Sequence, residues 1–132
     1  MTSSNSNIIK RFHLLNVDED ALMHQILGSL FEINGFTVSH ADTTEQALSI
    51  LNFYKVDLMI VNILADSNLG FNLLKVLRHI SNTPAIVISP VKDDKFKTYC
   101  LELGAINYFH KPVNFDELIY CVKQTLGIGT VL

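Results

Sequence analysis

Short runs of apolar residues alternate along the chain with stretches in which apolar residues recur every three or four positions. Short apolar runs are typical of buried strands, and the longer recurrence is typical of amphipathic helices. The pattern predicts five strands, at residues 12–17, 36–41, 57–61, 85–88 and 106–109. It predicts five helices, at residues 21–33, from 43 onward, 69–80, 93–103 and 114–126.

Each predicted strand is followed by a helix, which is the arrangement of an α/β fold with a parallel sheet. Parallel neighbours need a crossover connection, so the helices cover both faces of the sheet. The first, third and fourth strands are nearly all apolar, as central strands are, whereas residues 36–41 are mixed and suit an edge. We therefore expect a doubly wound five-stranded sheet whose functional groups gather beyond the carboxyl ends of the strands.

Composition narrows the class of protein. The chain has 132 residues, of which 48% are hydrophobic and 17% charged, so one globular domain is expected. The net charge is −3 and no basic cluster occurs, which argues against direct nucleic-acid binding. No apolar run reaches the length of a membrane span, the first residues do not resemble a signal peptide, and the two cysteines, Cys100 and Cys121, suit reduced thiols. We expect a cytoplasmic protein with no membrane contact.

Polar residues follow the apolar strands at the end where chemistry is expected. Asp18 and Glu19 come after the first strand, Asn62 after the third, Ser89 after the fourth and Lys111 after the fifth. A helix N-terminus also favours acidic residues. This alternative is a sufficient explanation for Asp20, but a less complete one for Asp18 and Glu19. A solvated loop lysine is the alternative for Lys111.

Four segments in this order resemble the receiver domain of response regulators, the phosphoacceptor module of two-component signalling. They are LLNVDED, VDLMIVN, AIVIS and GAINYFHKP. The resemblance spans about residues 10–126 and implies a flavodoxin-like, CheY-like fold with strand order 2-1-3-4-5. On this basis we expect a flexible tail at 1–9, a receiver-like domain at 10–126, and a C-terminal tail or the start of a linker at 127–132.

The resemblance also implies a role for each polar residue. Asp18 and Glu19 would hold a divalent cation, normally Mg²⁺, because hard cations prefer oxygen ligands. Ser89 would hydrogen-bond a phosphoryl group and Lys111 would pair with its charge. Tyr108 would be the aromatic residue that moves with the switch.

One position departs from the family, because Asn62 stands where the family has the phosphorylated aspartate. An amide oxygen is neutral and a poor nucleophile, and its presence removes one anionic ligand from the cation, so we expect a weak or vacant Mg²⁺ site. Two further departures are Asp66, where the family usually has proline, and Pro90, where it prefers a small residue. The Lys111–Pro112 bond is expected to be cis, as in the family.

The sequence favours an atypical receiver, or pseudo-receiver, that is not an enzyme and signals through protein contacts without ordinary aspartyl phosphorylation. The alternative is a phosphorylatable receiver in which an engineered change has replaced aspartate by Asn62. A flavodoxin-like ligand-binding or enzyme domain is a third reading. The acidic residues 18–20 disfavour it, because they would repel a phosphate at the helix N-terminus.

The last predicted helix is apolar around much of its circumference. It is either a fully packed terminal helix or part of an interface. The resemblance implies that the fourth helix, fifth strand and fifth helix together meet a protein partner, an output domain or a second copy in a homodimer. No metal-ligand spacing connects the histidines at 13, 24, 40, 79 and 110.

Overall fold

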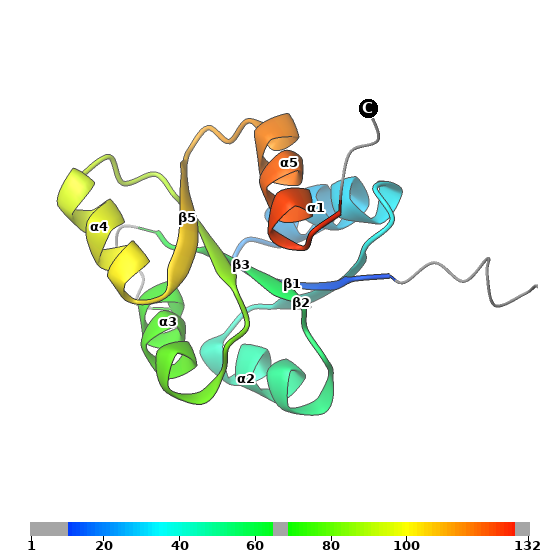
Figure 1. Cartoon of the computed structure of the whole chain (residues 1–132), viewed down its shortest axis with the longest axis horizontal. Helices are drawn as coiled ribbons and strands as arrows, with labels where there is room; N and C mark the ends of the chain where they lie inside the picture. The colour runs from blue at the N-terminus through cyan, green and yellow to red at the C-terminus, as the bar shows by residue number, and fades with distance from the viewer. Residues whose placement is uncertain (1–10, 65–68, 129–132) are drawn as a thin grey trace, which may run out of the picture.

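The computed structural model describes residues 11–64 and 69–128. Five parallel strands form one sheet in the order β2-β1-β3-β4-β5 (Figure 1). The strands are β1 (His13–Val17), β2 (Thr37–Ala41), β3 (Leu58–Asn62), β4 (Ala85–Ser89) and β5 (Ala105–His110). The predicted fold class and strand order are confirmed, and the mixed strand β2 lies at an edge as expected.

Helices cover both faces of this sheet. They are α1 (Ala21–Ile33), α2 (Thr44–Phe53), α3 (Leu69–Ile80), α4 (Asp94–Glu102) and α5 (Phe115–Thr125). In Figure 1, α1 and α5 lie on one side of the sheet, and α2 and α3 lie on the other. Within the described ranges, none of the helices combines the length and the apolar character that a bilayer span requires.

The local sequence explains where these helices begin and end. Four N-termini have a capping side chain that accepts a backbone N–H of the first turn, at Asp20, Thr43, Asp93 and Asn114. Gly35 follows α1 with φ 91°, a left-handed conformation that glycine adopts without steric cost. The predicted helix and strand limits therefore agree with the structure to within one or two residues.

Alternation along the strands gives the sheet two separate hydrophobic layers. Leu15, Val17, Met59, Val61 and Val87 pack with side chains of α2, α3 and α4. On the opposite face, a second set packs with α1 and α5: Leu14, Leu58, Ile60, Ile86 and Ile88. Two strands end in buried polar residues, which places their side chains at the carboxyl edge between these layers.

Candidate functional site

The site is centred on a contact between Asn62 and Asp18. β1 and β3 are parallel neighbours, so the last residue of β3 and the residue that follows β1 meet at one edge of the sheet. Asn62 Nδ2 donates a 2.7 Å hydrogen bond to Asp18 Oδ2. Both residues are buried, with 3% and 1% of their surfaces exposed. The sequence prediction that these two residues lie together is met by the geometry.

The surroundings of Asp18 hold its carboxylate in place. Asp18 Oδ1 accepts the backbone N–H of Asp20 at 2.9 Å, and the backbone carbonyl of Asp18 accepts a 2.6 Å bond from His24 Nε2. Burial raises the pKa of the Asp18 carboxyl above its ordinary value, and the Asp20 N–H and the positive charge of Lys111 partly offset that rise. Lys111 therefore lies close enough to act on the Asp18 carboxylate, and its predicted pairing with a phosphoryl group stays a prediction.

In the Asn62 amide, the nitrogen has a hydrogen-bond partner and the oxygen does not. Its Oδ1 atom is buried and has no hydrogen-bond partner among the described residues. A buried acceptor without a partner costs free energy. The Asn62 side chain therefore has one neutral oxygen left for a ligand, while its nitrogen stabilises the negative charge of Asp18 by a hydrogen bond.

The other strand ends bring the remaining predicted residues to this edge. Ser89 ends β4 and is fully buried; its Oγ accepts the backbone N–H of Val91 at 3.2 Å. The Lys111 N–H donates to the Ser89 carbonyl at 3.0 Å, so the loop after β5 is fixed against β4. The Lys111–Pro112 bond is cis, which confirms that expectation.

Tyr108 points into the molecule from β5. Its hydroxyl donates a 2.6 Å bond to the carbonyl of Val91, and its ring packs edge-on against Phe96 of α4 with 6.1 Å between centroids. Burial raises the pKa of the Tyr108 phenol, and a hydrogen bond with the Ser89 side chain acts in the opposite direction. The tyrosine thereby connects the end of β4 with α4.

Several oxygen atoms at this edge of the sheet are of the kind that bind magnesium. Carboxylate oxygens of Asp18 and Glu19 and the unpaired Asn62 Oδ1 are ligand types that Mg²⁺ accepts. However, both oxygens of Asp18 already accept N–H groups. In the described part of the chain, no group of three or more His, Cys, Asp or Glu side chains is placed to hold a metal ion.

A cluster of histidines behind the site was not predicted. The rings of His24 and His40 stack with 4.7 Å between centroids and 19° between planes. The Asn16 amide lies 3.4 Å from His40 Nδ1, and its own Oδ1 is buried without a partner in the described residues. These residues come from β1, α1 and β2, so no local spacing in the sequence could have revealed the cluster.

The carboxylate of Asp57 lies outside the site. Asp57 precedes β3 at the opposite edge of the sheet, where its Oδ2 accepts the His13 N–H at 2.8 Å. Asp66 lies outside the described residues. His110 ends β5 half-buried, with its Nε2 3.1 Å from the Pro90 carbonyl oxygen.

The last helix is packed on one side and open on the other. Leu118 and Val122 of α5 are fully buried, which accounts for part of its apolar character, but Tyr120 is 59% exposed. On the neighbouring α4 and β5, large apolar side chains are also exposed: Tyr99, Leu101 and Ile106. The helix is therefore packed on one side only, and an interface on its exposed side stays a prediction.

Comparison with known proteins agrees with this geometry. Residues 14–123 match the response regulator receiver domain family. The chain is 34% identical over 113 residues to the transcriptional regulatory protein CpxR of Escherichia coli, covering 86% of this chain and 48% of that protein. It is 29% identical over 123 residues to the aerobic respiration control protein ArcA of the same organism, covering 90% and 52%. The chain thus spans about half the length of these relatives.

Solved structures give the same result. The receiver domain of a Francisella response regulator superposes with a TM-score of 0.82 at 30% identity, covering 89% of this chain and 98% of that one. A response regulator from Chloroflexus aurantiacus gives 0.81 at 29% identity, covering 89% and 99%. The span matched by the family, residues 14–123, includes β2 to β5, all but the first residue of β1, and the edge where Asp18, Asn62, Ser89 and Lys111 meet. This chain therefore belongs to the response regulator receiver domain family.

Proposed function

We propose that this receiver domain is a pseudo-receiver, which transmits signals through protein contacts without ordinary phosphorylation of an aspartate. The observation that carries the proposal is the 2.7 Å bond from Asn62 Nδ2 to Asp18 Oδ2. The amide donates to the acidic residue that would otherwise hold a cation. The site is thus held together by a hydrogen bond between its own side chains.

The chemistry of an amide explains the loss of phosphorylation. A carboxylate attacks phosphorus because it is anionic, whereas the amide lone pair is delocalised and the group is neutral. Here the amide nitrogen is also committed to Asp18, which fixes the orientation of the side chain. In this proposal no covalent acyl phosphate forms at Asn62, and the domain is not an enzyme.

The same contact weakens cation binding. Members of the family typically bind Mg²⁺ at this edge of the sheet, and Asp18 and Glu19 would hold it here with Asn62 Oδ1. An amide supplies no negative charge to a divalent cation, and its nitrogen competes with the cation for Asp18 Oδ2. We propose a weak Mg²⁺ site.

The partner surface would be the face formed by α4, β5 and α5. Tyr108 couples Ser89 to α4 through Val91 in the unmodified protein, so this face has a defined shape without a phosphoryl group. The exposed apolar side chains on that face suit a protein partner, an output domain or a second copy. The relatives CpxR and ArcA are about twice as long as the matched region, which leaves room in such proteins for an output domain.

Intact-mass spectrometry after incubation with acetyl phosphate and Mg²⁺ tests the proposal. The unsubstituted protein should gain no phosphoryl mass, and Asn62→Asp should gain it slowly and incompletely, since Pro90 stiffens the Ser89 loop. Asn62→Asp combined with Lys111→Ala is the control for a specific site. Phosphorylation of the unsubstituted protein would overturn the proposal. Rapid stoichiometric phosphorylation of Asn62→Asp would favour the alternative, a functional receiver whose aspartate has been replaced.

The partner surface has its own test. Tyr120→Glu should abolish partner capture or self-association through this face, while circular dichroism shows that the fold is kept. A charged residue fits poorly in an apolar interface, and Tyr120 is exposed enough to be replaced without disturbing the core. If Tyr120→Glu keeps every association of the unsubstituted protein, the α4-β5-α5 face is not the partner surface.

A further inference from the structure

The ring of His40 on β2 is held between α1 and β1. It stacks on the ring of His24, with 4.7 Å between centroids. Its Nδ1 atom lies 3.4 Å from Nδ2 of Asn16, its neighbour on β1. A Cβ atom added at Gly28 of α1 would lie only 2.9 Å from His40 Nε2, so the ring approaches the helix closely. One face and both nitrogens of His40 therefore have a neighbour in the structure.

The contact with Asn16 defines where the proton of the His40 ring is. An amide nitrogen can only donate, so His40 Nδ1 accepts from Asn16 Nδ2, and the ring proton is then on Nε2. This is a neutral histidine. A second proton, on Nδ1, would point at the amino group of Asn16, and two donors would face each other. A protonated His40 therefore requires a change at Asn16.

Asn16 already carries the acceptor that a protonated His40 needs. Its Oδ1 atom is buried and has no hydrogen-bond partner among the described residues. A half-turn of the side-chain amide exchanges the positions of Oδ1 and Nδ2, because the two groups are nearly equal in shape and size. After the rotation, Oδ1 accepts from His40 Nδ1. A hydrogen bond from a charged donor is stronger than the neutral one that it replaces.

The other nitrogen of His40 faces an acidic residue. The position that a Cβ atom would take at Gly28 is 2.9 Å from His40 Nε2 and 3.8 Å from Glu32 Oε1. Glu32 follows Gly28 by one turn of α1, so its carboxylate and the His40 ring lie beside the same point of the helix. A protonated His40 would therefore have an acceptor for each of its two N–H groups.

We propose that His40 is a proton-binding residue, and that its protonation rotates the Asn16 amide and pairs the ring with Glu32. The proton comes from solvent and the added charge stays on the imidazole ring. A cavity of about 370 Å³ between α1 and β2, which His40 lines together with Gly28 and Glu32, gives the proton a path to the ring. Both new contacts begin at β2 and end on β1 or α1. The pH would therefore set how α1 is held on this edge of the sheet.

Three charged groups act on the ring: His24 and Glu32 of α1, and Asp42, which follows β2. Burial lowers the pKa of His40, a charge on His24 lowers it further, and the two carboxylates raise it. His40 should therefore take up its proton below pH 6.5, the ordinary pKa of the group. The stability that the neutral ring contributes is present above pH 6.5 and is lost as the pH falls through the lowered pKa.

NMR of the side-chain nitrogens in ¹⁵N-labelled protein, from about pH 8 to about pH 4, tests the proposal. His40 should start as the neutral form with its proton on Nε2 and end doubly protonated. The side-chain amide signals of Asn16 should shift with the same midpoint. An Asn16 amide that does not respond, or a His40 ring that starts with its proton on Nδ1, would overturn the proposal. So would a domain that unfolds before His40 is protonated.

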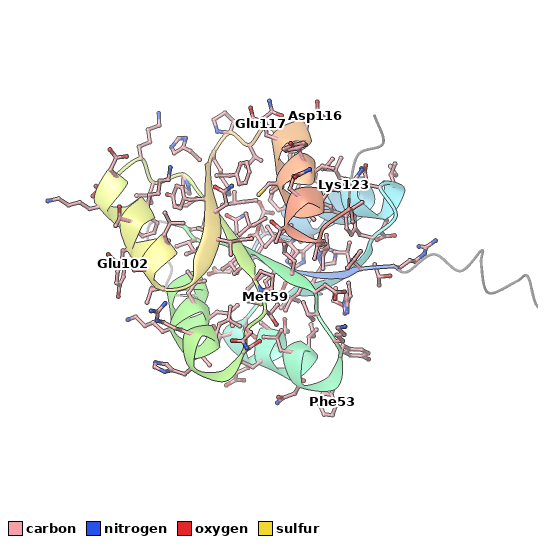
Figure 2. All side chains as sticks on the ribbon, in the orientation of Figure 1. Phe53, Met59, Glu102, Asp116, Glu117 and Lys123 are labelled. Atoms are coloured by element: carbon pink, nitrogen blue, oxygen red, sulfur yellow. The ribbon has the colours of Figure 1, made fainter. Side chains whose placement is uncertain are left out.

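Glu32→Gln tests the acidic partner. It should lower the midpoint of His40 by roughly half a pH unit, since the carboxylate is exposed and its charge is partly screened. Glu102→Gln is the matched control, because both glutamates are exposed and lie in the last turn of a helix. Figure 2 shows Glu102 projecting from α4, on the side of the molecule away from α1. Equal shifts in the two variants would overturn the pairing with Glu32.

Asn16→Leu distinguishes a rotating amide from a fixed one. A rotating amide binds the protonated ring more strongly than the neutral ring, so its removal should lower the midpoint of His40. A fixed amide, with Nδ2 always toward Nδ1, stabilises only the neutral ring. Its removal would raise the midpoint, and that result would overturn the proposal.

The titration of His40 is independent of the proposed function, because its residues lie on α1, β1 and β2 and do not include Asn62. Phosphorylation of the unsubstituted protein would overturn the pseudo-receiver proposal and leave the expected midpoint of His40 unchanged. A His40 ring that stays neutral in the folded domain throughout the pH series would overturn this inference alone.

Discussion

The two faces of the sheet bury apolar side chains of the same kind, yet only one of them also buries amide side chains whose oxygen has no hydrogen-bond partner among the described residues. Under α2, α3 and α4, the strands present leucine, valine and methionine. Under α1 and α5, Asn16 on β1 and Asn62 on β3 alternate with Leu14 and Ile60, and each has an unpaired amide oxygen among the described residues. The buried polar side chain on the first face, Ser89 at the end of β4, accepts the Val91 N–H, so unpaired amide oxygens distinguish the second face.

This difference indicates what the polar residues do. A buried amide with an unsatisfied oxygen lowers stability relative to a leucine of similar size. Asn62 contacts Asp18, and Asn16 contacts His40, whose ring stacks on the histidine that holds the Asp18 carbonyl. The polar residues of this face therefore form one connected group around the site, at a cost in stability.

The largest expected effect compares two adjacent residues of β1 that face opposite layers. Leu15→Asn should destabilise the domain by about 4 kcal/mol, because it removes a buried side chain and leaves an amide without partners. Asn16→Leu should be neutral or stabilise by up to about 1 kcal/mol, since it removes an unsatisfied oxygen. Urea denaturation of both variants measures the difference. A large loss of stability in Asn16→Leu would show that the two faces are equivalent.

Asn62→Asp should destabilise the protein by about 2 kcal/mol at neutral pH when no divalent cation is present. The change replaces a donor by a second carboxylate beside Asp18, and like charges at that distance repel. Mg²⁺ should recover the loss, because the variant gains an anionic ligand. Thermal melts with and without Mg²⁺ test both statements. The control is Asp57→Asn at the opposite edge of the sheet, whose melting temperature should not respond to Mg²⁺.

The pH dependence of stability should show the burial of Asp18. An acid whose pKa is raised by folding binds its proton more tightly in the folded state. Its contribution to the free energy of unfolding is therefore fully present below pH 3.8, the ordinary pKa of the group, and is lost as the pH rises through the raised pKa. Asp18→Asn should remove this part of the dependence of the unfolding free energy on pH. Chemical denaturation at a series of pH values measures it. An unchanged slope would mean that Asp18 is ionised as easily folded as unfolded.

The smallest expected effect concerns the packing of α1 on β2. A methyl group at Gly28 would lie 2.9 Å from His40 Nε2, so Gly28→Ala should gain none of the roughly 1 kcal/mol that alanine normally adds to a helix. In a His40→Ala background, the same substitution should stabilise by about that amount. A double-mutant cycle measures the coupling. Additive effects would mean that the His40 ring moves freely.

Much of the fold could be predicted because its signals are local. Apolar runs, capping residues and Gly35 lie within a few residues of the elements that they define. The positions of Asp18, Asn62, Ser89 and Lys111 at one edge follow from parallel strands whose carboxyl ends coincide. The periodicity of α1 was less informative, because Leu22 and Ile26 fit the helical pattern of a buried side but are exposed.

The sequence by itself determined the elements, their order and the chemical types of residue at the strand ends, since side-chain periodicity and backbone capping act over one or two turns. The tertiary structure alone decided which atoms meet. Asn62 and Asp18 are 44 residues apart, and His24 and His40 are 16 apart. Only packing of the sheet against α1 sets which amide atom faces the carboxylate and which side of the helix remains open, because those contacts depend on how separate elements approach in space.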